Sequence, residues 1–469
     1  MNNLLKRTIP CIFPLFLNGC GNDDLDTNSI DAPNTYTFAS QTDPSVNSSV
    51  DYSDATTSLI LIKELEYLIG SDYLQEVGST QGKQAAIDLL NKIYVDGTQY
   101  LSVTNIYDAQ SILPTPIMGV TTSAEKKQVD FSSLGSAVKL QESLPGISAD
   151  LFYRKENFAS QGDFIGWSEP SLLDEDLLPD IMIQNWFGEI ADLASDDDPD
   201  TKFIKSGINY QVLVGSFLLG ATAYYQSTAY LINIDVGLAV SNTSEGTYTA
   251  LQHNWDMAFG YFGANAHYKL FNKDQNSTEF EFDNDNDQEI DLLSEYNLGY
   301  SVDAATLDAS SVLYDTNLST NSVQAFLNGR KIINDHLNSS LAGNVDFKKA
   351  MLMQADTINT LWEHVIAAKL IHYLNLTAID ALHYGETDEI NAYYAEHWGH
   401  AKGYALALQF NPSAIITLEE LTDLHSFIGQ APSLKDDIYI KNEYSKKLVN
   451  AREKIRGIYD FSTVNALNW

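Results

Sequence analysis

Apolar side chains recur every three or four residues over most of the chain after Tyr52, which is the spacing of a helix face. Residues 59–69 and 86–94 carry two such faces. The same periodicity predicts helices over Leu172–Ala194, Ile204 to about Ile234, Thr249–Phe262, Ser322–Leu337, Val345–Leu382, Asp388–Leu408, Ser413–Ile428 and Asn442–Tyr459. No long alternating run of β-branched residues requires a large sheet. The pattern therefore predicts an all-α protein.

Two of the predicted helices are unusually apolar, namely those around 210–221 and 362–382. Asn209, Gln211 and Ser216 interrupt the first of them. A helix that is apolar on all sides is typical of the centre of a bundle, so we interpret both as central bundle helices and not as membrane spans.

A seven-residue pattern, Trp-x-x-Ala-x-Gly-Tyr, occurs at 255–261 and again at 398–404. Its small residues would let neighbouring helices approach closely. The repetition favours a duplicated helical bundle, with 51–265 as the first half, 266–320 as an acidic loop insertion and 321–469 as the second half. The alternative is that packing alone selected the same pattern twice.

The first twenty residues have the layout of a lipoprotein signal. Lys6 and Arg7 precede an apolar run over 9–17, and the segment ends in Leu17-Asn18-Gly19-Cys20. This order predicts a signal peptide over 1–19 and acylation of Cys20. Gly21, in place of Asp, resembles an outer-membrane sorting signal. Residues 20–50 are rich in Asn, Asp, Ser, Thr and Pro, and predict a flexible tether.

Cysteine usage and charge narrow the function classes. The chain has only two cysteines, of which Cys11 lies within the predicted signal, so a disulfide is not expected after processing. Acidic residues number 63 against 27 basic ones, which gives a formal net charge of −36. A nucleic-acid partner is therefore not expected, because such proteins present a basic face. The hydrophobic content of 44% is enough for a packed core.

The segment 283–291 has the carboxylate spacing of a calcium loop. The candidate ligands are Asp283, Asp285, Asp287, Glu289 through its backbone carbonyl, and Asp291. Position 6 is Gln288, where a calcium loop favours Gly, and position 12 is Ser294, with Glu295 one residue late as the bidentate ligand. The alternative to a structural calcium site is a solvated acidic loop.

Histidines and carboxylates three or four residues apart form a candidate transition-metal site for iron or zinc. The candidate ligands are His253, Asp256, Glu396 and His400. The alternative for each pair is helix capping and packing. The chain lacks a Gly-rich phosphate loop, a His-Glu-x-x-His motif, a Gly-x-Ser-x-Gly motif and a cysteine nucleophile in the mature part.

Several short segments, taken in their order along the chain, resemble the bacterial lipoprotein family of domain of unknown function 4856. The resemblance covers essentially the whole mature chain. They are Tyr36-Thr37-Phe38, Tyr52-Ser53, 253–263, the acidic loop running into 291–297, 368–375, 397–412 and the terminal Asn468-Trp469. The family is distantly similar to imelysins, which are helical envelope proteins with a duplicated bundle, associated with iron acquisition and in part described as peptidases. The nearest match to the imelysin motif Gly-x-His-x-x-Glu is His253-Asn254-Trp255-Asp256, which lacks the Gly and has Asp for Glu.

We therefore predict an all-α, duplicated, imelysin-like bundle anchored to the outer membrane by lipid. Its predicted role is that of a non-catalytic binding or scaffold component, connected with metal or iron uptake, whose partner is an envelope protein or a metal ligand. One alternative is a metal-dependent peptidase that uses the four transition-metal candidates. Another is a surface interaction protein with no metal chemistry.

Overall fold

The computed structural model describes residues 30–97, 127–128, 138–145, 164–168, 178–196, 203–243, 246–278, 282–284, 286, 289–291, 294–312 and 315–469. The α-helices are α1 Ser53–Ile69, α2 Asp72–Gln81, α3 Lys83–Asn91, α5 Leu140–Ser143, α6 Pro179–Ala194, α7 Tyr210–Leu218, α8 Ala250–Phe262, α9 Lys273–Asn276, α10 Gly299–Ser310, α11 Leu318–Asp335, α12 Val345–His383, α13 Asp388–Ala407, α14 Leu418–Ile428, α15 Ile438–Ile458 and α16 Thr463–Asn468. The prediction of an all-α fold is confirmed.

Shorter elements connect or extend these helices. The π-helical segments are η1 Lys92–Asp96, η5 Leu219–Tyr224 and η6 Gln226–Leu231, and the 3-10 turns are η7 Gly237–Ala239 and η8 Tyr268–Leu270. Two-residue strands form two pairs. β1 Lys127–Gln128 runs parallel to β4 Glu289–Ile290, and β2 Ile204–Lys205 runs antiparallel to β3 Ile208–Asn209.

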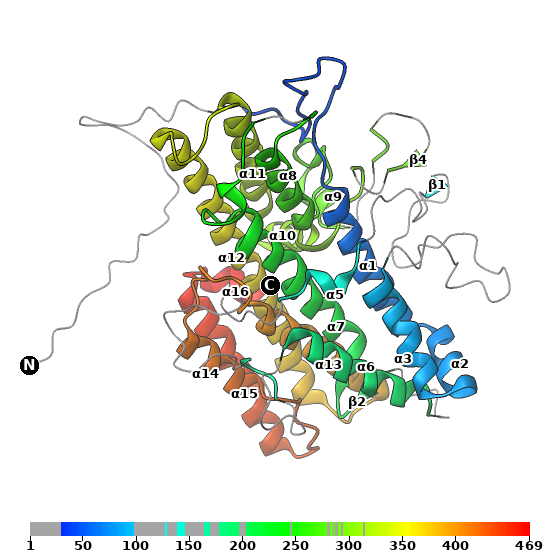
Figure 1. Ribbon diagram of the computed structural model, residues 1–469. Coiled ribbons are helices and arrows are strands. Elements are labelled where there is room, and N and C mark those ends of the chain that lie inside the picture. Colours follow the sequence, from blue (N-terminus) through cyan, green and yellow to red (C-terminus); the bar gives the residue numbers. More distant parts are fainter. Residues whose placement is uncertain are drawn as a thin grey trace, which may run out of the picture.

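Helix α12 is the axis of the molecule, with α11, α13 and α15 packed along it (Figure 1). Its 39 residues extend about 58 Å at 1.5 Å per residue. Among the described helices it is the one long and apolar enough, by length and composition, to cross a bilayer, and 61% of its most apolar window is buried. The burial fits the expectation that 362–382 belongs to a central bundle helix.

The core is rich in aromatic rings and converges on Trp362 of α12, which is fully buried. The rings of Phe262, Tyr300 and Tyr224 lie 5.2, 5.6 and 6.0 Å from it between centroids. These three rings come from α8, α10 and η5, so one side chain joins the central helix to three others. Burial of such rings contributes several kcal/mol in all.

The two copies of the Trp-x-x-Ala-x-Gly-Tyr pattern lie on α8 and α13, and both tryptophans are fully buried. A Cβ atom on Gly260 would lie 2.7 Å from the Cβ of Tyr52, against α1. A Cβ on Gly403 would lie 2.5 Å from the Cβ of Ser216, in α7. Each glycine therefore permits a close helix contact, as the pattern predicts. Whether the bundle is duplicated stays a prediction.

Residues 30–50 do not form the flexible tether predicted for 20–50. Tyr36 is buried and stacks on Phe259 at 3.7 Å between ring centroids. Its hydroxyl donates to Oδ1 of Asp256 at 3.0 Å, and Nη2 of Arg330 donates to Oγ of Ser49 at 3.0 Å. Most residues of this segment are small and polar, which is why its composition predicts a tether. Its packing depends on only two aromatic residues, Tyr36 and Phe38, which are both buried. Residues 20–29 lie outside the described part.

The segment 266–320, predicted as a loop insertion, contains a helix that belongs to the bundle. This is α10, which packs against α11 and α12. Three of its seven buried residues are polar, namely Ser301, Asp303 and Asp308, so it shows no continuous apolar stripe. The helix predicted from Ile204 begins instead at Tyr210, because Ser206 and Gly207 have positive φ and form the β2–β3 turn.

Candidate functional site

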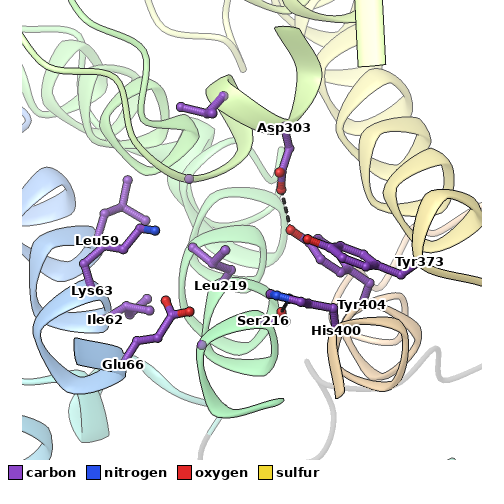
Figure 2. Close-up of a pocket in the computed structure, with 13 residues that line it drawn as sticks. Leu59, Ile62, Lys63, Glu66, Ser216, Leu219, Asp303, Tyr373, His400 and Tyr404 are labelled. Atoms are coloured by element: carbon purple, nitrogen blue, oxygen red, sulfur yellow. Dashed lines mark hydrogen bonds between the residues drawn. The ribbon is translucent and has the colours of Figure 1, made fainter. Parts of the chain in front are cut away.

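A pocket of about 150 Å³ lies between α1, the α7–η5 segment, α10, α12 and α13 (Figure 2). Helices from all three thirds of the chain supply its walls. The lining residues are Leu59, Ile62, Lys63, Glu66, Gly215, Ser216, Leu219, Gly299, Val302, Asp303, Tyr373, His400 and Tyr404. The lining combines apolar side chains with groups able to form hydrogen bonds, as in many ligand sites.

Local backbone features open this space between packed helices. The α-helical hydrogen-bonding pattern of α7 changes to a π-helix at Leu219, one turn after Ser216. Such π-segments are frequent at functional sites. Gly215 and Gly403 keep α7 close to its neighbours, since a Cβ on Gly215 would lie 2.9 Å from Oε2 of Glu66. Polar side chains from three helices are thereby brought to one place.

Ser216 and His400 form the first polar pair of the pocket. Oγ of Ser216 and Nδ1 of His400 lie 2.8 Å apart. The imidazole stacks on the ring of Tyr373, with centroids 4.3 Å apart, and Tyr373 in turn stacks on Tyr404 at 5.8 Å. The histidine is therefore fixed on one face by an aromatic ring and at one nitrogen by a hydroxyl.

The carboxylate of Asp303 is the second polar centre. The hydroxyl of Tyr404 donates to its Oδ2 at 2.6 Å, and Nζ of Lys369 lies 2.9 Å from its Oδ1 (Figure 2 shows the tyrosine bond). The ammonium of Lys369 also lies 5.6 Å from the centroid of the Tyr373 ring. Burial and the nearby Asp303 charge raise the pKa of Tyr404 well above its usual value, so its hydroxyl remains a donor.

His400 and His372, which precedes Tyr373 on α12, are both neutral at pH 7. Burial, with a smaller contribution from the positive charge of Lys369, lowers the pKa of His400 to about 3. The same two causes, in the same order, lower the pKa of His372 to about 4. A histidine with so low a pKa is a weak proton acceptor at neutral pH. The contact between Ser216 and His400 therefore joins a hydroxyl to a neutral imidazole.

Helix α1 supplies the opposite wall, with Lys63 and Glu66 one turn apart and both partly buried. Figure 2 shows the Glu66 carboxylate directed across the pocket toward Ser216 and His400, with the Lys63 ammonium reaching into the same space. Lys63 and Glu66 therefore place one positive and one negative charge on the α1 wall of the pocket.

His253 and Asp256, predicted as transition-metal ligands, both make contacts with other parts of the protein. Asp256 is fully buried, and Nε of Arg330 donates to its Oδ1 at 2.8 Å. His253 stacks on Tyr248 at 5.2 Å, and its Nδ1 lies 4.0 Å from Oδ2 of Asp51. The carboxylate of Asp256 thus joins α8 to α11 and to the N-terminal segment.

The structure does not bring the four transition-metal candidates into one site. Glu396 and His400 lie on α13, which packs on α7 and α12, whereas His253 and Asp256 lie on α8. Across the described ranges, no three His, Cys, Asp or Glu side chains are placed to share a metal ion. Of the four, only His400 lines the pocket.

The acidic loop is described only in part, since Asp285, Asp287 and the side chain of Glu289 lie outside the described residues. Glu295, which is buried, accepts the backbone N–H of Asn284 at 2.6 Å and that of Asp291 at 2.9 Å. Its carboxylate therefore closes the loop by binding backbone amides. The calcium site stays a prediction, and so does the acylation of Cys20, which also lies outside the described part.

Sequence reasoning missed Lys63, Glu66, Ser216, Asp303 and Tyr373 as site residues. One signal was present, since Ser216 interrupts the apolar run over 210–221. A polar side chain in a helix that is apolar all round requires a buried partner, which here is His400. Asp303 and the α1 pair gave no such signal, because carboxylates and lysines are ordinary on helix surfaces.

Comparison of the chain with protein-family models, with curated proteins and with solved structures found no match.

Proposed function

We propose that the chain is a lipid-anchored, non-catalytic binding protein of the outer membrane that takes a small polar ligand in the pocket between α1, α7, α10, α12 and α13. The observation that carries the proposal is the convergence of Lys63, Glu66, Ser216, Asp303 and His400 on one pocket from four different helices. Polar side chains are seldom gathered in a helical interior unless they meet each other or a ligand.

Binding fits these groups better than catalysis does. A serine nucleophile needs a base whose pKa lies near the working pH. The pKa of His400 is about 3, so the imidazole would not retain the proton of Ser216 at neutral pH. Asp303, the nearby carboxylate, is engaged by Tyr404 and Lys369. The metal-dependent peptidase alternative lacks support, since its four candidate ligands are divided between α8 and α13.

The location in the envelope rests on the sequence around Cys20. We expect wild-type protein expressed in a Gram-negative host to be found in the outer-membrane fraction, with a mass that includes a diacylglyceryl cysteine. We expect Cys20→Ala to lose the lipid. Fractionation with mass spectrometry tests this, and an unacylated wild-type Cys20 would contradict it. A role in metal or iron uptake, and an envelope protein partner, remain predictions.

The pocket is tested separately from the anchor. Ligand-observed NMR of the full chain against a mixture of metabolites of up to about ten non-hydrogen atoms should reveal binders. Val302→Phe adds bulk to a lining residue and should abolish their binding. Val312→Phe is the matched control, because Val312 is 61% exposed just beyond α10. Binding that survives Val302→Phe unchanged would place the ligand elsewhere.

A further inference from the structure

The surroundings of the Ser216 hydroxyl show where its proton lies. Other buried serines in helices donate to the carbonyl one turn earlier, as Ser322 does to Leu318 at 2.7 Å. Within the described part of the chain, the Ser216 hydroxyl meets only Nδ1 of His400, at 2.8 Å. Ser216 is buried, so a hydroxyl proton without an acceptor would be costly. The hydroxyl therefore donates to Nδ1.

A hydrogen bond received at Nδ1 fixes the tautomer of His400. A neutral imidazole carries one proton, so this proton lies on Nε2 when Nδ1 accepts. The ring is neutral at pH 7, because burial and the positive charge of Lys369 lower its pKa to about 3. His336 has the opposite arrangement, since its Nδ1 lies 2.9 Å from the carbonyl oxygen of Ile332, which can only accept.

The Nε2–H group of His400 is left for the pocket. The partly exposed imidazole lines the pocket, stacks on Tyr373 at 4.3 Å and has Nδ1 occupied by Ser216 (Figure 2). Among the described residues, no group forms a hydrogen bond with Nε2. A donor beside a cavity without a protein acceptor is met by water or by a ligand oxygen.

The charged lining residues favour an uncharged ligand. The carboxylate of Asp303 is met by Nζ of Lys369 at 2.9 Å and by the Tyr404 hydroxyl at 2.6 Å. Lys63 and Glu66 also interact with other groups of the protein. A charged ligand would lose water beside groups whose charges are already engaged, which is unfavourable.

We infer that the pocket binds an uncharged carbonyl compound, an amide or a ketone, whose oxygen accepts the Nε2–H of His400. Ser216 is then a positioning residue, because its hydroxyl holds the imidazole in the donor tautomer. This inference rests on the proposed function, since it names the ligand class of the same pocket. The apolar part of such a ligand would lie against Leu59, Ile62, Leu219 and Val302.

The tautomer is tested first, by imidazole NMR of the full chain with isotope-labelled histidine at pH 8, where an unperturbed histidine is neutral. The signals of His400 are assigned by their loss in His400→Gln. They should show the proton on Nε2, whereas those of His336 should show it on Nδ1. A proton on Nδ1 of His400 would overturn the inference.

The role of Ser216 is tested by the same spectrum. Ser216→Ala removes the donor to Nδ1, so the signals of His400 should change to those of a mixture of both tautomers. Ser322→Ala is the control, since Ser322 donates to a backbone carbonyl. An unchanged His400 tautomer in Ser216→Ala would show that the serine does not set it.

Three probes of similar size then test the ligand class through the Nε2–H signal of His400. Butanone is uncharged and only accepts, propionate accepts but is negative, and propylamine is positive at pH 8 and cannot accept. Butanone should shift the signal and bind about fivefold or more tightly than the other two. Equal binding of propionate or propylamine, or no shift with butanone, would contradict the inference.

Two substitutions of His400 separate donation from packing, with butanone binding measured by ligand-observed NMR. Gln keeps an N–H near the position of Nε2, whereas Asn, one methylene shorter, keeps a polar group only near Nδ1. His400→Gln should bind butanone within about threefold of the wild type, and His400→Asn about fivefold or more weakly. His383→Asn, at an exposed histidine, is the control. Equal binding by the two His400 variants would show that this N–H does not meet the ligand.

The outcome also separates the inference from the proposed function. If butanone does not bind but another metabolite in the NMR mixture binds and is excluded by Val302→Phe, the ligand class is wrong and the binding function stands. If no metabolite binds and Cys20 is not acylated, the proposed function itself fails.

Discussion

At the scale of single residues, the pocket depends on groups held in one protonation state by their surroundings. His400 can accept a hydrogen bond from Ser216 because the imidazole is neutral. Tyr404 can donate to Asp303 because its pKa is raised far above neutrality. The sequence marked Ser216 as a polar break in an apolar helix, and it marked His400 only as a metal candidate. The partners of Ser216 belong to distant helices, so residue spacing could not reveal them.

The low pKa of His400 predicts a loss of stability in acid. Its folded-state pKa of about 3 lies below the value near 6.5 expected for unfolded chains. The unfolded state therefore binds more protons between these values, and stability falls as the pH falls below about 6.5. Between pH 7 and pH 5, the free energy of unfolding should therefore fall by about 1–2 kcal/mol less in His400→Gln than in the wild type.

Urea unfolding at a series of pH values measures this difference. His383→Gln is the control, because His383 is an exposed histidine at the end of α12. Parallel pH profiles for the wild type and His400→Gln would show that this histidine does not contribute to acid lability.

At the scale of elements, apolar periodicity located the helices with regular apolar faces, and α12 matches its predicted span within one residue at its end. It failed where helices are not apolar or where the chain turns. Helix α10 has a buried face that is partly polar, and the β2–β3 turn depends on positive φ values that spacing does not encode. The apolar periodicity did not predict α10, and α10 supplies Asp303 to the pocket, so the pocket was not predicted either.

The close helix contacts at Gly260 and Gly403 lead to a prediction about packing. Gly260→Ala and Gly403→Ala should each destabilise the protein by about 1–3 kcal/mol, because the nearest atoms are Cβ and backbone atoms that cannot move freely. Gly188→Ala, in α6, is the matched control, since no atom lies within 4 Å of its added Cβ.

The control should be neutral or stabilise by up to about 1 kcal/mol through helix propensity. Chemical denaturation gives all three values. Stabilisation by Gly260→Ala and Gly403→Ala would show that these glycines are not required for helix approach.

At the scale of the whole molecule, the helices of the predicted halves are interleaved, with α13 packed on α7 and α11 on α8. The buried pair of Asp256 and Arg330 joins this body to residues 30–50. Asp256→Asn removes the negative charge and leaves Arg330 buried without it, which should lower the free energy of unfolding by about 3–5 kcal/mol.

The same variant should expose residues 30–50 to proteases, and limited proteolysis with mass spectrometry would locate the cuts. Asp335→Asn, at a surface pair with Lys331, is the control. Resistance of residues 30–50 in a folded Asp256→Asn protein would show that this ion pair does not hold the segment.

The anchoring of Tyr36 sets how far the protein can stand from a membrane. With Cys20 acylated, as we propose, sixteen residues separate the lipid from the buried ring of Tyr36. Even a fully extended chain of that length spans at most about 55 Å. A tether ending at residue 50 would reach about twice as far. Acylation of Cys20, as proposed, would therefore hold the body within about 55 Å of the bilayer.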